Sequence, residues 1–283
     1  TGSGNGIKQF IAGQVNFAGS DSALKTKPKD GKIETDEAKT ACGSEAWNIP
    51  MVTGPIAVSY NLKDVKDPIT LTPAVLADIF NGKIAKWNDK AIADLNKDAK
   101  LPDSDIKPMF RSDESGTTEN FQKYLGSAAP AEWSADKKGK AFKGGTGQGA
   151  SGNAAVAATV NKAEGTITYA EWSFAKAQKL QVANIITSAG PEAVKLSSES
   201  VAKTIESAKF KTPGSKDLVI DTEGRRRLTR SQKVGVAGVA TLAGVALIGV
   251  VAGLLLDRLL DFDDALDAGG EWDEGGGVFT RWQ

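Results

Sequence analysis

The sequence of 283 residues has no histidine and a single cysteine, Cys42. The lack of histidine excludes catalytic triads and general bases built on imidazole, together with most familiar transition-metal sites. One cysteine excludes a disulfide within the chain and a cysteine-rich metal cluster. We therefore expect no catalytic residue, no metal and no cofactor. Cys42 is interpreted as a small apolar residue beside Ala41, with pairing to a cysteine outside this sequence as the alternative.

The chain also has no excess of either charge, because 35 lysines and arginines balance 35 aspartates and glutamates. A balanced chain has no overall positive field to attract a polyanion, so nucleic acid is not an expected partner. Thr1 is not an initiator methionine, and no signal peptide precedes it. Because residues 1–14 read as a loop that enters a helix without a preceding strand, we expect a processed chain or a fragment.

Strand-like and helical segments alternate over the first 220 residues. Strands are expected at 15–21, 51–62, 106–111 and 166–169, and helices at 6–14, 72–81, 115–125, 153–162 and 170–180. Thr72 and Pro73 supply a capping residue followed by a proline at the first helical position. This alternation predicts an α/β fold.

One short stretch carries the strongest functional signal, the run Arg-Ser-Asp-Glu-Ser-Gly-Thr at residues 111–117, which precedes a helix-like segment. Small hydroxyl residues and a glycine at a helix start direct backbone N–H groups, side-chain hydroxyls and the positive end of the helix dipole at one point. Arg111 adds a planar, two-pronged donor suited to an oxyanion. The stretch predicts an anion site, and phosphate is the anion that fits.

Three other features are ambiguous when each is taken alone. The glycine-rich start at residues 2–6 fits an ordinary tight turn as well as an anion loop. Asp21 follows a strand, where it fits a cap or turn residue. The second glycine-rich segment, residues 144–152, fits a flexible connection better than a phosphate cradle. The presence of all of them in this order favours a shared site.

The ordered set of motifs resembles the phosphate-binding proteins of bacterial ABC-type phosphate importers. The segments that carry the resemblance are Gly-Ser-Gly-Asn-Gly-Ile-Lys-Gln (2–9), Val-Asn-Phe-Ala-Gly-Ser-Asp (15–21), Gly-Lys-Ile-Ala-Lys-Trp-Asn-Asp (82–89), Arg-Ser-Asp-Glu-Ser-Gly-Thr-Thr (111–118) and Gly-Thr-Ile-Thr-Tyr-Ala-Glu (165–171). It runs from residue 1 to about residue 222. It implies a two-lobed, type II periplasmic-binding-protein architecture that clamps phosphate in a cleft and delivers it to an ABC permease on the extracytoplasmic face of a bacterial membrane.

The resemblance also implies a set of ligands. Those from the first lobe are Ser3 and Asp21, and those from the second are Arg111, Ser115, Gly116 and Thr117. Asp113 matches a position that holds the arginine in place.

Physical chemistry agrees, because phosphate near neutral pH keeps at least one P–OH and can donate to the Asp21 carboxylate, whereas sulfate cannot. An unpaired carboxylate facing a buried sulfate costs several kcal/mol, which corresponds to discrimination of about 10⁴-fold.

The sequence departs from the family at both ends. The initial strand and loop of the type Gly-Ser/Ala-Thr-Phe-Pro is missing, and after Asp221 the chain does not continue as the family does. We therefore expect an incomplete first lobe at residues 1–62, with roughly half of the core it needs, and a second lobe at 63–222. A truncated or chimeric reading frame with weak anion binding, or none, is one hypothesis.

The character of the sequence changes after Glu223. A basic linker at 223–233 precedes residues 234–256, a run of 23 without charge, and an acidic tail follows at 257–283. The run is long enough to cross a bilayer as a helix, and Gly249 and Gly253 have the spacing of close helix contacts in lipid. We expect a C-terminal transmembrane helix, with a buried globular helix as the alternative.

The charges around this run conflict with the expected location of the binding domain. Positive residues before a span and negative ones after it favour a cytoplasmic N-terminal flank, whereas a phosphate-capture domain belongs on the other side. The alternatives are a non-native junction and an exported domain that overrides the charge bias.

Two other classes of function are compatible with parts of the sequence. A membrane-anchored anion sensor or structural module would use residues 234–256 for self-association. An enzyme acting on phosphate esters is disfavoured because the sequence has no histidine, no expected metal site and no candidate nucleophile paired with a general base, and Ser115 near Arg111 is suited to binding charge.

Overall fold

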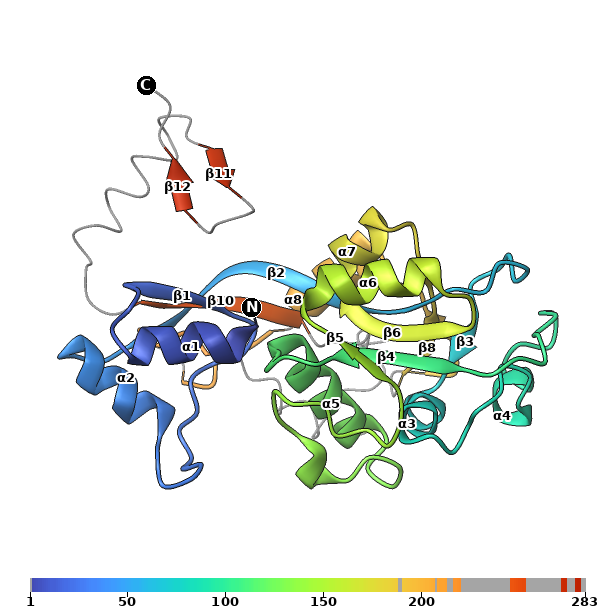
Figure 1. Ribbon diagram of the computed structural model, residues 1–283, viewed down its shortest axis with the longest axis horizontal. Coiled ribbons are helices and arrows are strands. Elements are labelled where there is room, and N and C mark those ends of the chain that lie inside the picture. The colour runs from blue at the N-terminus through green and yellow to red at the C-terminus, as the bar shows by residue number, and fades with distance from the viewer. Residues whose placement is uncertain are drawn as a thin grey trace.

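The structure is a computed structural model that describes residues 2–187, 190–206, 208–212 and 216–219, together with three strands at Val245–Ala252, Glu271–Asp273 and Val278–Thr280. Two α/β parts are joined by one long strand, β2 (Trp47–Tyr60), as Figure 1 shows. We call residues 2–46 the amino-terminal part and residues 61–187 the second part. Strands alternate with helices in both, which confirms the predicted α/β class.

The main sheet has the order β1-β10-β2-β6-β4-β5, and β7 pairs with β2 off this path. Residues 47–55 of β2 pair with β10, and residues 56–60 pair with β6, so one strand serves both halves of the sheet. The bounds of the strands in this sheet are β1 Phe17–Ser20, β4 Lys107–Arg111, β5 Gln148–Ala150, β6 Thr166–Glu171, β7 Gln181–Val182 and β10 Val245–Ala252.

The second part is organised around the buried strand β6. Helices α3 (Pro73–Asn81) and α5 (Gly116–Ala128) lie on one side of the sheet, and α6 (Gly152–Lys162) and α7 (Trp172–Ala177) on the other (Figure 1). Tyr169 of β6 stacks on Phe121 of α5 with 4.2 Å between ring centroids, and Phe80 of α3 packs edge-on against Phe121 at 5.1 Å. This aromatic cluster fixes α5 against the sheet.

The amino-terminal part has a much smaller core. Helix α1 (Ser3–Ile11) and helix α2 (Glu34–Cys42) pack beside β1 (Figure 1). Their buried apolar residues form a cluster of Ile7, Phe10, Ala18, Leu24 and Ala38. Half-buried Cys42 packs against this cluster, in agreement with its interpretation as a small apolar residue.

Local signals account for most elements of the second part. Thr72 caps α3 by accepting from the amide of Val75 at 3.2 Å, Pro73 is the first helical residue, and Gly82 ends the helix in the left-handed conformation. By contrast, α1 begins at Ser3 and not at the predicted Gly6, because its first turn is held from outside: the amide of Gly4 donates to the carbonyl of Glu114 at 3.0 Å.

The remaining elements are short. Helix α4 spans Lys90–Ala93, α8 spans Ser198–Glu206, and a 3₁₀ turn spans Ala135–Lys137. Strands β3 (Thr70–Leu71), β8 (Asn184–Ile186) and β9 (Ala193–Val194) form a second sheet, and β11 (Glu271–Asp273) pairs with β12 (Val278–Thr280).

The structure differs from the predicted helix at residues 234–256. Residues 245–252 form β10, which is antiparallel to both β1 and β2 and lies between them. Without β10 the facing edges of these two strands would leave their hydrogen-bonding groups unpaired, and a run rich in Val and Ile suits a strand. Residues 234–244 and 253–256 lie outside the described residues. Within the described part of the chain, no helix has the length and apolar character needed to cross a membrane.

Candidate functional site

The site residues predicted from the sequence lie close together where the amino-terminal part meets the start of α5. Ser3 opens α1, Asp21 follows β1, and Gly116 is the first residue of α5. The Ser3 hydroxyl accepts from the amide of Asp21 at 3.0 Å and from the amide of Gly116 at 3.2 Å. One oxygen thus joins elements that lie 113 positions apart.

Gly116 is required by the closeness of this contact. A Cβ atom at that position would lie 2.5 Å from the Ser3 hydroxyl and 2.6 Å from Cβ of Asp21. Contacts this short do not occur between real side chains. The glycine therefore lets the amino-terminal part reach the helix start, and any larger residue would push the two apart.

Asp21 and Thr117 form the second contact across the same boundary. The Thr117 hydroxyl donates to Oδ2 of Asp21 at 3.0 Å, and the Asn120 side chain donates to the carbonyl of Asp21 at 2.9 Å. Asn153, near the start of α6, donates to the Thr117 hydroxyl at 3.4 Å. The Thr117 hydroxyl therefore accepts a hydrogen bond from Asn153 and donates one to Asp21.

The electrostatic setting of Asp21 combines burial with nearby donors. Burial raises the pKa of its carboxyl, while the Thr117 hydrogen bond and the charge of Arg111 lower it. The Glu171 carboxylate acts in the same direction as burial and is a smaller influence on the pKa. Asp21 is thus an acceptor with a higher proton affinity than a solvated carboxylate.

Arg111 ends β4 and is almost fully buried, with 5% of its surface exposed. Its guanidinium binds Asp113 through two bonds, Nε to Oδ1 at 2.7 Å and Nη2 to Oδ2 at 2.5 Å. The amide of Gly152 also donates to Asp113 at 3.1 Å. Burial works against the Asp113 carboxylate, but the hydrogen bonds from Arg111 and Gly152 prevail and lower its pKa to about 2. The arginine is therefore oriented by a carboxylate that stays ionised.

Ser115 has a structural task as the N-cap of α5. Its hydroxyl accepts from the amide of Thr118 at 3.2 Å, and its own amide donates to the carbonyl of Lys140 at 3.0 Å. Tyr169 supports the same turn, since its hydroxyl lies 2.8 Å from the Thr118 hydroxyl and accepts from the amide of Arg111 at 3.4 Å. The helix start and the end of β4 are thus held to one another.

The glycine-rich segment at 144–152 is packed against other elements over its first residues. A Cβ at Gly145 would lie 2.5 Å from the carbonyl oxygen of Asn81, and one at Gly147 would lie 2.6 Å from that of Pro108. Close packing on α3 and β4 therefore explains these glycines. The far end of the segment leads into α6, whose first residues contact Asp113 and Thr117.

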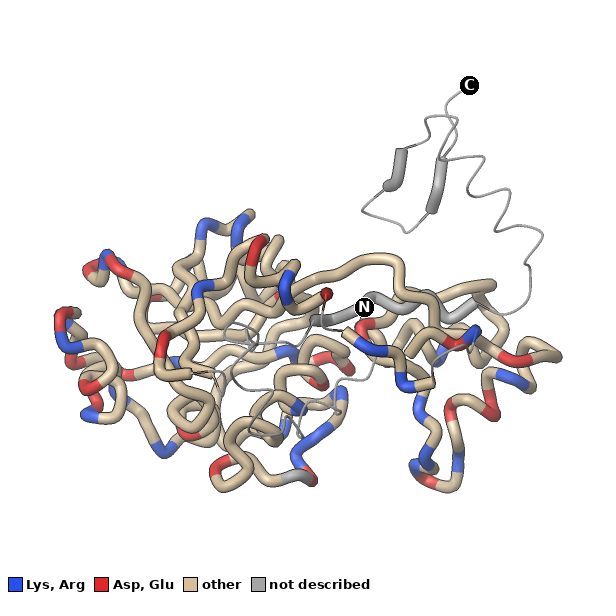
Figure 2. Tube along the Cα trace, turned by 180° about the vertical axis from the view of Figure 1, so that it is seen from behind, with Lys and Arg blue, Asp and Glu red and all other residues tan. Residues whose placement is uncertain are grey.

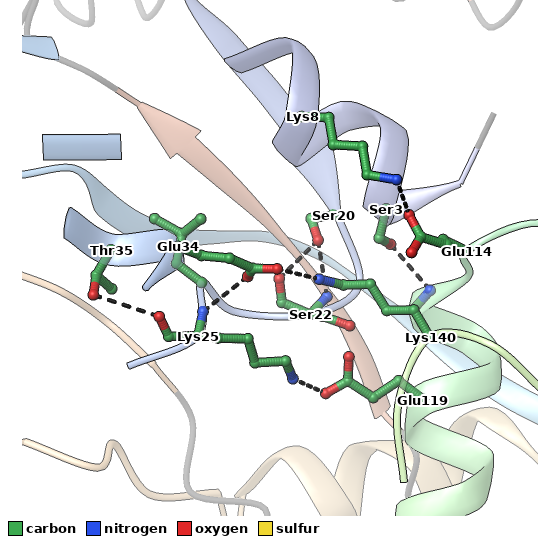
Figure 3. A network of polar contacts seen from close by, with 12 residues as sticks. Ser3, Lys8, Ser20, Ser22, Lys25, Glu34, Thr35, Glu114, Glu119 and Lys140 are labelled. Atoms are coloured by element: carbon green, nitrogen blue, oxygen red, sulfur yellow. Dashed lines mark hydrogen bonds and ion pairs between the residues drawn. The ribbon is translucent and has the colours of Figure 1, made fainter. Parts of the chain in front are cut away.

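Three ion pairs near the site join the two parts of the chain and were not predicted from the sequence. Figure 3 shows Lys8 with Glu114, Lys25 with Glu119, and Lys140 with Glu34. The partners lie 94 to 106 positions apart, so no local pattern could reveal them.

Elsewhere on the described surface, acidic and basic residues are interspersed (Figure 2), in keeping with the balanced composition.

Taken together, the arrangement gathers several hydrogen-bond donors around the Asp21 carboxylate, and in this structure these groups bind one another: Gly116 donates to Ser3, Thr117 to Asp21 and Arg111 to Asp113. The donors belong to Arg111, the hydroxyl residues and the start of α5, and the acceptor is the Asp21 carboxylate. Such a set suits a small oxyanion that keeps a proton. Among the described residues, no group of three or more acidic or cysteine side chains has the arrangement of a metal site.

Comparison with known proteins gives three consistent findings. A family model described as a PBP superfamily domain matches residues 1–230. "Phosphate-binding protein PstS 3" of Mycobacterium leprae is 49% identical over 221 residues, which is 78% of this chain and 58% of that protein. The protein of that name in Mycobacterium tuberculosis strain H37Rv is 48% identical over 229 residues, covering 81% and 60%. The chain thus spans about three fifths of the length of these relatives.

Solved structures agree on the fold. "Crystal structure of DING protein" matches with a TM-score of 0.63 at 19% identity, over 93% of this chain and 77% of that one. "Phosphate-Binding Protein from Stenotrophomonas maltophilia" matches with a TM-score of 0.57 at 18% identity, over 97% and 78%. At these identities the likeness concerns the fold alone, an α/β fold of the type II periplasmic-binding-protein kind, as the sequence predicted.

Proposed function

Because this chain belongs to the family of PBP superfamily domains, we propose that it binds inorganic phosphate reversibly and delivers it to the permease subunits of an ABC importer. The observation that carries the proposal is the contact of Ser3 and Asp21 with Gly116 and Thr117 at the start of α5. The names of relatives 48–49% identical to this chain support phosphate as the ligand.

The ligands in this proposal have separate tasks. Gly116, Thr117 and Ser115 supply the start of α5 with its dipole, and Ser3 supplies a hydroxyl from the amino-terminal part. Arg111 neutralises charge, held in orientation by Asp113. Asp21 accepts a hydrogen bond from the P–OH group that phosphate retains near neutral pH, which gives selectivity against sulfate. The anion therefore needs groups from both parts of the chain.

The same division suggests how binding and release are achieved. In our proposal residues 1–62 are the first lobe and residues 63–222 the second, with β2 as the strand that crosses between them. Closure of the lobes would bring Asp21 and Ser3 against α5, and opening would separate them. The basic stretch at residues 223–233 lies outside the described residues.

Reversible binding fits the site better than hydrolysis of phosphate esters. The Ser115 hydroxyl accepts a hydrogen bond from the backbone and caps a helix, so it is held as an acceptor rather than activated as a nucleophile. The Thr117 hydroxyl donates a hydrogen bond to Asp21, to which our proposal gives a role in binding the anion. We therefore assign no catalytic role to either residue.

Delivery to an importer places the domain on the extracytoplasmic face of the membrane. Attachment through residues 234–256 is an alternative that the length of the uncharged run favours, whereas the charges that flank the run favour a cytoplasmic location of the preceding domain. The pairing of residues 245–252 in β10 is unfavourable to it. Carbonate extraction of membranes and protease accessibility of residues 1–220 in intact cells would test both the attachment and the side of the membrane.

Titration calorimetry of the purified full chain at pH 7 tests the central proposal. We expect heat on addition of phosphate, saturating at one anion per chain, and little or none with sulfate. Equal binding of both anions would contradict the role of Asp21. The absence of phosphate binding would favour the alternative of a chimeric chain with little activity.

A further inference from the structure

Four charged residues near the candidate site form a continuous series of contacts between the two parts of the chain. Lys25 and Glu34 come from the amino-terminal part, and Glu119 and Lys140 from the second part. Lys25 binds Oε1 of Glu119, and Lys140 binds Oε1 of Glu34 at 3.1 Å. The amide of Lys25 donates to Oε2 of Glu34 at 2.9 Å, which links the two ion pairs in one series (Figure 3). We call these four residues the clasp.

Each ion pair of the clasp has one well-shielded partner, whereas the other partners, Lys25 and Glu34, are 37% and 26% exposed. The Glu119 side chain is 1% exposed and that of Lys140 is 10% exposed. By comparison, Lys86 and Asp103 form an ordinary surface pair whose side chains are 50% and 72% exposed. A shielded charge that loses its partner is left with an uncompensated desolvation cost, so the clasp has more influence on the structure than a surface pair.

Glu119 connects the clasp to the anion site. It lies in the first turn of α5, the helix whose first residues, Gly116 and Thr117, contact Ser3 and Asp21. A carboxylate there repels an anion bound at the helix start unless a cation compensates it. Two lysines do so. Lys25 comes from the amino-terminal part, and Lys123, which belongs to the same helix as Glu119, places its Nζ 2.7 Å from Oε1 of that carboxylate. Only the bond to Lys25 requires the two parts to be together.

We propose that the clasp is an affinity-determining device, in which Lys25 reaches Glu119 only when the lobes close and thereby couples closure to anion binding. This inference rests on the proposed phosphate-binding function. Closure forms the Lys25–Glu119 and Lys140–Glu34 pairs. Lys25 then compensates the charge of Glu119, the carboxylate in the first turn of the helix at which the anion binds. A ligand that favours the closed form is in turn held more tightly by whatever stabilises that form. Lys25 and Glu34 are thus positioning residues that never touch the anion.

Two lysines on one carboxylate provide a matched pair of variants. Lys25→Met and Lys123→Met each remove one cation from Glu119, but only the first removes a bond between the lobes. We expect Lys25→Met to raise the Kd for phosphate about tenfold, chiefly through faster release, and Lys123→Met to raise it less than about threefold. Equal effects of the two variants, or no effect of Lys25→Met, would overturn the proposal.

Glu34→Gln provides an independent arm should Lys25→Met fail to fold. Its carboxylate is partly exposed, at 26%, so its loss is better tolerated than a change at Glu119. We expect a Kd for phosphate raised about threefold or more, whereas Lys86→Met in the surface pair leaves it unchanged. A Glu34→Gln variant that binds as tightly as the parent contradicts the clasp.

A distance measurement separates failure of the clasp from failure of the proposed function. Spin labels at Thr40→Cys and Ala128→Cys, both exposed positions, in a Cys42→Ser background report the separation of the lobes. Lys25→Met should shift the distribution to longer distances, and Lys123→Met should not. If the parent chain binds no phosphate, the phosphate proposal fails, and the distributions without phosphate still decide on the clasp: identical ones for parent and Lys25→Met overturn it.

Discussion

The hydroxyl of Thr117 donates to Oδ2 of Asp21 over 3.0 Å, although the two residues lie 96 positions apart in the chain. Thr117 belongs to the first turn of α5 and Asp21 to the loop after β1, so the bond ties the two parts of the molecule together at the candidate site. It also fixes polarity: Thr117 is the donor and Asp21 the acceptor. An anion bound at this position has to accept a hydrogen bond from Thr117 and donate one to Asp21.

Replacement of Asp21 by Asn is expected to reduce selectivity for phosphate over sulfate. The carboxylate accepts a hydrogen bond from the P–OH group and repels sulfate, whereas a carboxamide can donate to either anion. We expect the ratio of the sulfate Kd to the phosphate Kd to fall by at least about tenfold. Calorimetry with both anions at pH 7 measures it, and an unchanged ratio would remove Asp21 from the site.

Replacement of Arg111 by Lys should weaken both anions and leave their ratio unchanged. Lysine keeps a positive charge but loses the planar fork that Asp113 orients through two bonds. The expected increase in Kd is about 10- to 100-fold for each anion. Lys86→Met, in an exposed pair with Asp103, is the control and should bind as the parent does. A loss confined to one anion would show that Arg111 acts in selectivity and not in charge neutralisation.

Two glycines of α5 should respond to alanine in opposite ways. At Gly116 a Cβ would collide with Ser3 and Asp21, so Gly116→Ala should push the two parts apart and abolish tight phosphate binding. At Gly126 the nearest atom is 3.6 Å away, and Gly126→Ala should stabilise the helix by up to about 1 kcal/mol. Thermal melting and calorimetry compare the two. Normal phosphate binding by Gly116→Ala would contradict the described contact.

Glu119 should make stability dependent on pH in the acid range. Its burial disfavours the carboxylate, but Lys123 and Lys25 outweigh that effect and lower the pKa from 4.5 to about 2. A carboxyl group with a depressed folded-state pKa stabilises the fold above its unfolded pKa, and this stability is lost as the pH falls from about 4.5 toward 2.

Melting temperatures between pH 6 and pH 2.5 test this dependence. The parent should lose stability through that window, and Glu119→Gln should show a flatter profile. Glu199→Gln, at an exposed acid on α8, is the control and should keep the parent slope. A Glu119→Gln profile as steep as that of the parent would show that the acid sensitivity arises elsewhere.

Local chemistry was sufficient to predict the elements that have clear capping and terminating residues. Thr72, Pro73 and Gly82 define both ends of α3, and the hydroxyl residues before Gly116 define the start of α5. Helix α2 was not predicted, because its sequence is mostly polar and it buries only Ala38. Residues 245–252 illustrate the opposite problem: an apolar run has no period that separates helix from strand, so the edges of β1 and β2 decide its pairing.

The sequence by itself determined the α/β class and the family resemblance, and it predicted the donors and the acceptor of the site, because these depend on residue types in short runs. Tertiary structure alone decided which of them meet. Ser3 lies against Gly116, Asp21 against Thr117, and Lys25 against Glu119 only because β2 carries the chain from one part of the molecule to the other. Contacts between residues about a hundred positions apart leave no periodic trace in a single sequence, and their energies depend on burial, which only the folded chain defines.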